Sequence, residues 1–387
     1  MVMLKILKGP YLQCPTTTSM KIMWETSAQA TTEAFCWETE RVHGGLEGRH
    51  RRLHETKKAL SGEAATVHEI TVDGLEAASD YFYQVRSVVE ESGLSVRSGV
   101  HELRTAVPAG QSFSFTVASE FGGASSPVHT AEICSLMHAY RPDFIVLVGD
   151  AVGKGSDYDE WGKWLFGPAR ELLVNTPFYL CLGNHEEYSQ WYYRFVGYPK
   201  PKNYYAFRYG NAHFVALDST AIVTYRDGIP VRTAAEDCAL AAQTEFLDQE
   251  LAASDALWKF VFFHYPPYVS GDYQVEQMRD LAPHFERLGI DMVFNSHTIV
   301  YERSHPLRDN RLDLEHGVVY VVAGGAGARP QWLHHKRSWH TAQSRAIPHF
   351  VQVTVADRRL ELHAIDHLGN HFDSLRLQKR AGGREIV

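Results

Sequence analysis

Four groups of polar side chains in the second part of the chain each follow a short apolar run. The runs span residues 144–148, 178–182, 260–263 and 292–294. Ligands of α/β proteins gather at the carboxyl ends of strands, so the groups that follow these runs are predicted to meet at one sheet edge. The candidate metal ligands, one from each group, are Asp150, Asn184, His264 and His297.

These four residues are a carboxylate, an amide and two imidazoles, a set that suits zinc, manganese or iron better than a soft metal. A single His or Asp at a strand end is usually an ordinary hydrogen-bonded loop residue, and the chain has 21 histidines. Recurrence of a ligand type after four separate strands is harder to explain without a metal. The sequence therefore predicts a divalent metal site.

The elements that would position these residues alternate between strand and helix. Apolar runs at 113–118, 144–148, 259–263, 292–294 and 318–322 alternate with stretches whose apolar residues have helical spacing, such as Ile133, Leu136, Met137 and Tyr140. Strands separated by helices favour an α/β domain with sheet and helical layers. Two further alternating runs, 350–355 and 360–365, precede a tail rich in Lys, Arg and Gly.

The first hundred residues instead show short strands separated by turns, which is typical of a β-sandwich. Apolar and polar residues alternate over residues 67–72, and Asp73-Gly74-Leu75 is typical of a turn. The next strand-like run begins at Tyr81. Pro108-Ala109-Gly110 indicates a linker. We therefore predict a β-sandwich over residues 1–107, a linker over 108–112, the α/β domain over 113–378 and a flexible tail over 379–387.

The composition limits the function classes. The chain has 387 residues, of which 44% are hydrophobic and 22% charged, as in ordinary globular proteins. Its formal charge of −8 would repel a phosphate backbone, so we expect no nucleic-acid partner. We expect a small-molecule substrate. The basic stretch at 49–52 and 57–58 is interpreted as a solvated face. The sequence does not indicate an oligomeric state.

The location of the protein is predicted from its first residues and its cysteines. The N-terminal residues lack the apolar core of a signal peptide, and no apolar run approaches the roughly 18 residues that a membrane-spanning helix needs. The five cysteines are scattered and form no Cys-x-x-Cys motif, which disfavours a disulfide scaffold or a zinc knuckle. We expect a cytoplasmic protein with no membrane contact.

The order of these motifs resembles that of a known superfamily. Gly149-Asp150, Gly183-Asn-His-Glu186, His264-Tyr-Pro-Pro-Tyr268 and His297-x-x-x-Tyr-Glu-Arg303 are similar to the calcineurin-like metallophosphoesterases, and within them to the purple acid phosphatases. Gly9-Pro-Tyr-Leu-Gln13 and the pattern from Gly74 to Val85 resemble the fibronectin type III-like domain that precedes the catalytic domain in that branch; 166–168 and 324–327 resemble its bacterial members. The resemblance implies an αββα-type layered domain behind the sandwich.

This resemblance also implies roles for residues. Family members hold two metal ions, and Asp150, Asn184, His264 and His297 match the complete ligand set of one of them. Asp150 would also bridge to the second ion. His185 matches the family histidine that hydrogen-bonds the phosphoryl group and assists the leaving oxygen, and is our candidate catalytic residue.

The second metal site departs from the family pattern. Glu120 stands in place of an aspartate, Gly153 in place of the tyrosine that gives purple acid phosphatases their colour, and Ser296 and Ile299 in place of a glycine and a histidine. Glu120 with a shared Asp150 could hold only a weakly bound hard cation. We therefore expect one firmly bound divalent ion per chain, either Zn, Mn or Fe.

Two further segments remain open. His334, His335 and His340 follow the glycine-rich run and are interpreted as a solvated or substrate-contacting loop, with a replacement metal ligand as the alternative. Residues 220–238 form a plausible lid.

Three functions are compatible with these residues. The first is metal-dependent hydrolysis of phosphate monoesters or diesters, with one intact and one degenerate metal site. The second is a repurposed enzyme with one metal that acts on a small organic molecule. The third is a non-catalytic metal-binding module, and the intact His185 argues against it.

Overall fold

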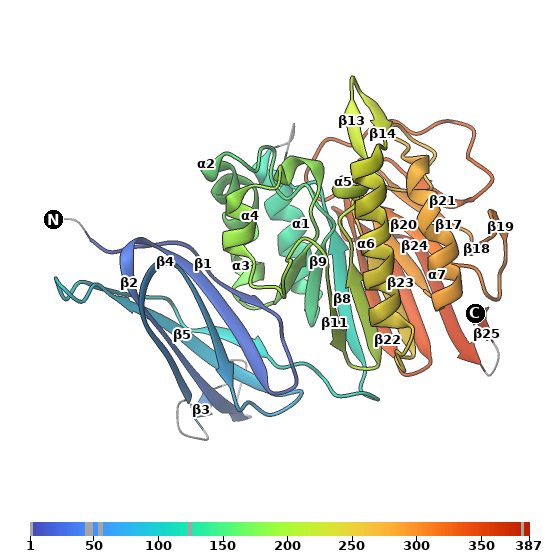
Figure 1. Ribbon diagram of the computed structural model, residues 1–387. Helices are drawn as coiled ribbons and strands as arrows, with labels where there is room; N and C mark the ends of the chain where they lie inside the picture. The colour runs from blue at the N-terminus through green and yellow to red at the C-terminus, as the bar shows by residue number, and fades with distance from the viewer. Residues whose placement is uncertain (1–2, 43–48, 53–56, 123–125, 381–382) are drawn as a thin grey trace.

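The computed structural model describes residues 3–42, 49–52, 57–122, 126–380 and 383–387. It shows an N-terminal region built of strands beside a larger region in which sheets are covered by helices (Figure 1). The fold class predicted from the sequence, a β-sandwich followed by a layered α/β domain, is confirmed. Within the described residues, no helix has the length and apolar composition that crossing a membrane requires.

The N-terminal region consists of antiparallel strands. The long strand β2 pairs with β1 and β4 along its first part, and with β4 and β5 along its second part, so the sheet folds over on itself. Alternate residues of β2 and β5, among them Trp24 and Tyr83, point into a shared apolar core. The strands are β1 (Ile6–Gln13), β2 (Ser19–Val42), β3 (Arg49–Arg52), β4 (Lys57–Asp73), β5 (Asp80–Val88), β6 (Ser95–Arg97) and β7 (His101–Arg104).

Tyr81, at the start of β5, pins the corner that the fibronectin-like pattern predicts. Its hydroxyl accepts a hydrogen bond of 2.8 Å from the backbone N–H of Glu76. A tyrosine in this position that bonds upstream backbone is a feature of such sandwiches. The basic stretch forms β3 and the start of β4, and its side chains lie outside the described residues.

The larger region contains two sheets that pack face to face. In the first, β8, β9 and β10 are parallel and β22 to β25 are antiparallel; in the second, β12, β15, β16 and β20 are parallel. Phe115 of the first sheet lies 5.3 Å from Phe260 of the second, measured between ring centroids. The first sheet has the order β10 (Phe178–Leu180), β9 (Phe144–Leu147), β8 (Phe113–Ala118), β22 (His349–Ala356), β23 (Arg359–Asp366), β24 (His371–Arg380), β25 (Gly383–Ile386). The second has the order β11 (Tyr205–Tyr209), β12 (Ala212–Ala216), β15 (Trp258–Phe262), β16 (Met292–Asn295), β20 (Val319–Ala323), β17 (Tyr301–Ser304), β21 (Thr341–Arg345).

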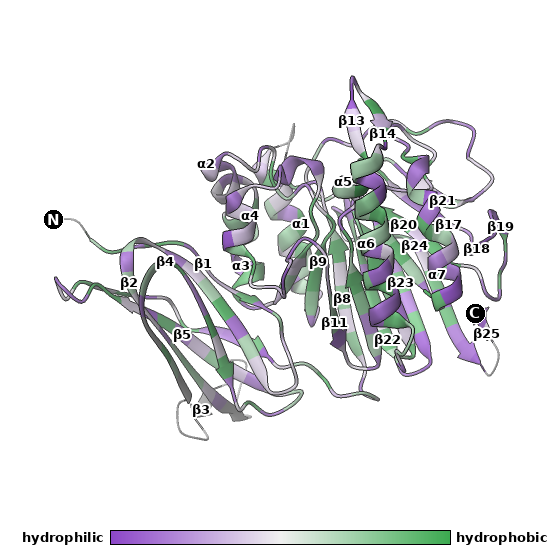
Figure 2. Ribbon diagram, in the orientation of Figure 1, coloured by the Kyte–Doolittle hydropathy of each residue, from purple (hydrophilic) through white to green (hydrophobic). Residues whose placement is uncertain are grey.

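Helices cover the outer faces of both sheets. On the second sheet, Leu247 of α6 and Phe285 of α7 belong to the same buried cluster as Val261 of β15. Figure 2 shows mainly hydrophobic central strands and many hydrophilic residues on the outward sides of α6 and α7. The helices are α1 (Pro127–Ala139), α2 (Tyr158–Glu160), η1 (Trp161–Phe166), α3 (Arg170–Leu173), η2 (Asn184–Glu186), α4 (Gln190–Phe195), α5 (Ser219–Ile222), α6 (Ala234–Leu251), η3 (Glu276–Leu281) and α7 (Ala282–Leu288). Two small hairpins complete the fold: β13 (Thr224–Arg226) with β14 (Ile229–Val231), and β18 (Leu307–Arg308) with β19 (Arg311–Leu312).

The sandwich is docked against the layered region through buried polar contacts. The Tyr11 hydroxyl donates to the carbonyl oxygen of Phe195 at 3.0 Å, and the Tyr83 hydroxyl donates to that of Val174 at 2.7 Å. The Tyr11 ring also packs on Phe166, with ring centroids 4.9 Å apart. The Gly-Pro-Tyr motif near the N-terminus therefore contributes to the interface between the two regions.

The chain end differs from the flexible tail predicted for residues 379–387. Strand β24 continues to Arg380, and β25 pairs with it. Lys379 Nζ lies 2.7 Å from Asp291 Oδ2, and Arg384 donates to the Asp291 carbonyl oxygen at 2.9 Å. Asp291 is a buried carboxylate, so these cations supply partners that its burial requires. Residues 381 and 382 lie outside the described residues.

Candidate metal centre

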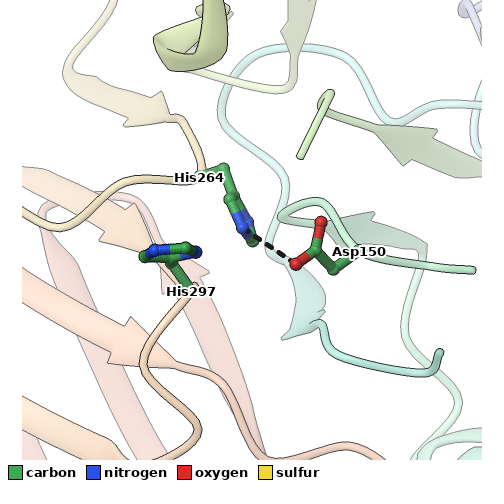
Figure 3. Close-up of side chains that lie close together, drawn as sticks. All are labelled: Asp150, His264 and His297. Carbon is green, nitrogen blue, oxygen red and sulfur yellow. Dashed lines mark ion pairs between the residues drawn. The ribbon is translucent and has the colours of Figure 1, made fainter. Parts of the chain in front are cut away.

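The four predicted metal ligands converge from both sheets. Asp150 follows β9 and Asn184 follows β10 in the first sheet, whereas His264 follows β15 and His297 follows β16 in the second. The carboxyl ends of these parallel strands lie at one edge of the two packed sheets. Figure 3 shows Asp150, His264 and His297 turned toward one another there.

The distances between donor atoms are those of neighbouring ligands. His264 Nε2 lies 3.1 Å from Asp150 Oδ2 and 3.1 Å from Asn184 Oδ1. One donor atom each of Asp150, His264 and His297 lies within 4.8 Å of the other two. His264 Nδ1 is 2.8 Å from the carbonyl oxygen of Val148, so its N–H points there and Nε2 is left facing the group. A backbone oxygen on the far nitrogen is the usual support of a metal-ligating histidine.

The charges in this group also suit a cation. Burial alone would raise the pKa of Asp150, but His264 and His185 lower it to about 2, so the carboxyl is ionised. Burial lowers the pKa of His297 to about 3, which keeps its ring neutral. Burial opposes protonation of His264, but Asp150 raises its pKa to about 9. A divalent cation can replace the proton on His264, because metal binding releases protons from its ligands. The donor set therefore fits a divalent metal ion.

Glu186 clamps together the two turns that carry Asp150 and Asn184. Its fully buried carboxylate accepts hydrogen bonds from the backbone N–H groups of Asp150 (2.9 Å), Ala151 (2.8 Å) and Gly183 (2.6 Å). Sequence reasoning quoted Glu186 only as part of a motif and missed this role. Its place three residues after Gly183, as in a capping box, was the available signal.

His185 lies at the solvent side of the donor group. Its backbone N–H donates to Asp150 Oδ1 at 3.0 Å, and its Nδ1 is 2.7 Å from the carbonyl oxygen of Gly153. The side chain is 47% exposed, and Nε2 lies 3.9 Å from Asp150 Oδ2. Burial would lower the pKa of His185, but Asp150 raises it above the ordinary value. The ring therefore presents Nε2 beside the donors at the accessible face.

Glu120 is bonded to protein groups. It follows β8 with a positive φ of 61°, and its Oε1 accepts from Ser296 Oγ at 2.6 Å and from the His297 N–H at 2.9 Å. Oε1 is 4.0 Å from His264 Nε2. Burial and the charge of Asp150 raise the pKa of Glu120 to about 7. This carboxyl fixes the turn before His297.

Comparison with known proteins identifies this region. Residues 127–301 match the family model described as calcineurin-like phosphoesterase. The chain contains a calcineurin-like phosphoesterase domain. Among curated relatives, purple acid phosphatase 15 of Arabidopsis thaliana is 25% identical over 330 residues, which cover 72% of this chain and 57% of the relative. Purple acid phosphatase 18 of the same plant is 26% identical over 340 residues, covering 80% and 69%. The chain spans little more than half the length of the first two curated relatives.

Solved structures show the same fold. Purple acid phosphatase PPD1 from yellow lupin seeds matches with a TM-score of 0.79 at 15% identity, covering 95% of this chain and 74% of that one. The structure titled PhoD matches with a TM-score of 0.66 at 13% identity, covering 97% and 91%. The predicted resemblance to the calcineurin-like and purple acid phosphatase families is confirmed.

Other predicted residues of the phosphoesterase domain lie apart from the donors. His340 is buried beside Glu302, with Nδ1 3.7 Å from Oε1, while His334 and His335 are exposed. Among the described residues, none of the three belongs to the group formed by Asp150, His264 and His297. The structure thus gives no support to the alternative that one of them replaces a lost metal ligand.

The segment 220–238 contributes a residue that sequence reasoning missed. It forms α5, the β13–β14 hairpin and the start of α6, and the Tyr225 hydroxyl lies 3.0 Å from His297 Nε2. No periodic pattern in the sequence distinguishes Tyr225 from other tyrosines.

Proposed function

We propose that this chain is a metal-dependent hydrolase of phosphate monoesters or diesters. It works with one firmly held divalent ion, Zn, Mn or Fe, and a small-molecule substrate. The observation that carries this proposal is that His264 Nε2 lies 3.1 Å from both Asp150 Oδ2 and Asn184 Oδ1. His297 belongs to the same group as Asp150 and His264. The homology to purple acid phosphatases supports the same reaction class.

The residues of the chain divide the chemistry between them. When bound, a divalent ion supplies Lewis-acid activation of a phosphoryl oxygen and of water. Asp150, Asn184, His264 and His297 hold that ion. His185 holds Nδ1–H on the Gly153 carbonyl oxygen. In the protonated ring, which the raised pKa of His185 favours, Nε2–H can donate a hydrogen bond to the phosphoryl group and a proton to the leaving oxygen.

The proposal of one ion per chain rests on the side of the centre where Glu120, Gly153 and Ile299 depart from the family pattern. Glu120 Oε1 accepts hydrogen bonds from Ser296 Oγ and from the His297 N–H. Neither Gly153 nor Ile299 has a metal-donor atom in its side chain. A second ion would stabilise the opposing oxygens of the transition state, and removing such stabilisation costs roughly 3–4 kcal/mol. We therefore propose a slow phosphoesterase, or one that prefers activated esters or diesters.

The test combines metal analysis with turnover. The purified chain is loaded with Zn, Mn, Fe or Mg, its metal content is measured, and nitrophenyl phosphate monoesters and diesters are assayed. His185→Asn should keep the metal and reduce kcat by about 100-fold or more. His129→Asn, which alters an exposed histidine on α1, is the matched control and should leave kcat unchanged. A metal-loaded chain that hydrolyses no phosphate ester would overturn the proposal.

A second candidate is a one-metal enzyme for a small organic molecule. The favouring observation is the aromatic surface beside His297, whose ring contacts those of Tyr265 and Tyr225 at centroid distances of 4.6 and 5.4 Å. Ile299 adds apolar surface in the same turn. Binding of metal without phosphoester turnover would favour this function, and a chain inert toward all substrates would favour the metal-binding module.

We also propose a reducing, cytoplasmic location. Its support is that the five cysteines are scattered along the chain without a Cys-x-x-Cys motif, and that three of them, Cys36, Cys134 and Cys181, are buried. Cell fractionation tests this location, and recovery of the protein outside the cell would contradict it.

A further inference from the structure

We propose that Tyr225 is a positioning residue of the metal centre, whose hydroxyl accepts a hydrogen bond from Nε2–H of His297 and so leaves the Nδ1 lone pair to face Asp150 and His264. The two atoms lie 3.0 Å apart. This inference rests on the metal centre of the proposed function but not on the reaction. It adds a residue from a hairpin outside the strands that carry the ligands.

The geometry of the His297 ring carries the inference. An imidazole has two nitrogens, and in the neutral ring one carries the proton while the other offers a lone pair. Figure 3 shows one nitrogen of His297 directed toward His264 and Asp150 and the other directed away from them. Since Nε2 is bonded to the Tyr225 hydroxyl, Nδ1 is the atom left to the donor group.

His264 provides an internal comparison. Its Nδ1 bonds to a carbonyl oxygen, that of Val148, and its Nε2 faces the donors. His297 has the reverse arrangement, with an oxygen on Nε2 and Nδ1 facing the donors. Both ligand histidines thus have an oxygen on the far nitrogen, the arrangement that fixes the tautomer and orientation of a metal ligand. For His264 that oxygen is backbone, whereas for His297 it is a side chain and can be removed by substitution.

The hairpin that carries Tyr225 is held in place by its neighbours. Tyr225 pairs with Pro230 across β13 and β14, and the Pro230 carbonyl oxygen accepts from Gln277 Nε2 at 2.9 Å. Arg232, just past the hairpin, forms ion pairs of 2.7 Å with Asp237 of α6 and Asp280 of η3. The predicted lid segment therefore has an anchored base, and its tyrosine reaches a metal ligand from there.

Ring packing restrains His297 further. The rings of Tyr225, Tyr265 and Tyr273 lie at centroid distances of 5.4, 4.6 and 5.3 Å from it. Among the described residues, Tyr225 is the one of these three tyrosines whose hydroxyl forms a hydrogen bond with an imidazole nitrogen of His297. The Tyr225→Phe change therefore removes the hydrogen bond and keeps the ring, while Tyr273→Phe is a matched control that removes a hydroxyl from a neighbouring ring.

The first test needs no variant of Tyr225. Long-range ¹H–¹⁵N NMR of the metal-free full chain reports which nitrogen of each histidine carries the proton, and His297→Asn assigns the signal. We expect the Nε2–H tautomer for His297. The Nδ1–H tautomer would overturn the inference, because Tyr225 would then donate to Nε2 and the lone pair would face away from the donors.

The second test measures metal affinity in place of activity. Removing a partner behind a ligand weakens metal binding by about 10- to 100-fold, so we expect Tyr225→Phe to bind Zn²⁺ that much more weakly than the wild-type chain. Tyr273→Phe should bind within about twofold of wild type, and thermal unfolding of the metal-free variants should coincide. Equal or tighter binding by Tyr225→Phe would overturn the inference. A chain that binds Zn²⁺ but hydrolyses no ester would refute the proposed function alone.

Discussion

The two sides of the metal centre are built on the same kind of strand ends but use their side chains differently. On one side, Asp150 and His264 direct donor atoms at each other across 3.1 Å. On the other side, the Glu120 carboxyl turns to Ser296 Oγ at 2.6 Å and to the His297 N–H. Hydrogen-bond donors of the protein thus occupy Oε1 of Glu120.

The two sides differ in their side chains more than in their backbone. Glu120 sits at the end of β8 as Asp150 sits at the end of β9, and both have positive φ, 61° and 53°. What differs is one methylene of length at Glu120 and the hydroxyl that Ser296 adds. Ser296 Oγ also accepts from Ser119 Oγ at 2.6 Å, so a chain of hydrogen bonds runs from Ser119 through Ser296 to the Glu120 carboxyl. The comparison predicts that the side of Asp150 and His264 governs metal binding, whereas the side of Glu120 and Ser296 governs local stability.

The largest effect is expected from His264→Ala. His264 is fully buried and its Nε2 lies within 3.1 Å of two other predicted ligands, so its loss removes a central donor. We expect metal content to fall from one ion per chain to near zero, with an affinity loss beyond the roughly 10–100-fold typical of losing only a supporting partner. Elemental analysis after dialysis measures this. A variant that retains a full ion would show that the two sides do not differ as described.

The convergence of the four predicted ligands could be predicted from the sequence because the information for it is local. Asp150, Asn184, His264 and His297 each follow an apolar strand directly, and parallel strands bring their ends together. The layered domain and the sandwich were predicted for the same reason, from periodicity within short windows. Their roles as ligands remain proposals that the metal analysis tests.

The remaining features depend on partners that are distant in the sequence. The turn that Glu120 fixes lies 176 residues away at Ser296, and Tyr225 reaches His297 from 72 residues away. The chain end was predicted to be flexible because its composition is basic, but Asp291, 93 residues before Arg384, gives that charge a buried partner. No local pattern contains such pairings.

An intermediate effect is expected from Glu120→Ala. The change leaves Ser296 Oγ and the His297 N–H without their buried acceptor, which costs about 1–3 kcal/mol for each unsatisfied group. We expect the free energy of unfolding to drop by that order while one ion per chain is still bound. Urea unfolding and metal analysis measure the two quantities. Glu120→Gln, which keeps an acceptor oxygen, is the matched control; loss of the bound ion in both variants would make Glu120 a ligand.

The smallest effect is expected from rebuilding the second side with Glu120→Asp, Ser296→Gly and Ile299→His together. Replacing Ser296 by Gly removes the hydroxyl that now bonds the carboxyl at position 120. Ile299→His adds a metal-donor nitrogen two residues after His297. Gly153 still lacks a donor atom, so the rebuilt side should bind its ion weakly, with a second equivalent appearing only at high metal concentration. A gain of about tenfold in phosphoester turnover corresponds to only about 1.4 kcal/mol of transition-state stabilisation.

The single Ile299→His variant is the control, because Glu120 remains bonded to Ser296 in it and we expect no second ion. The triple variant could bind a second ion without any rise in turnover. That result would show that the Glu120 side does not limit the rate and that the two sides differ in metal content alone.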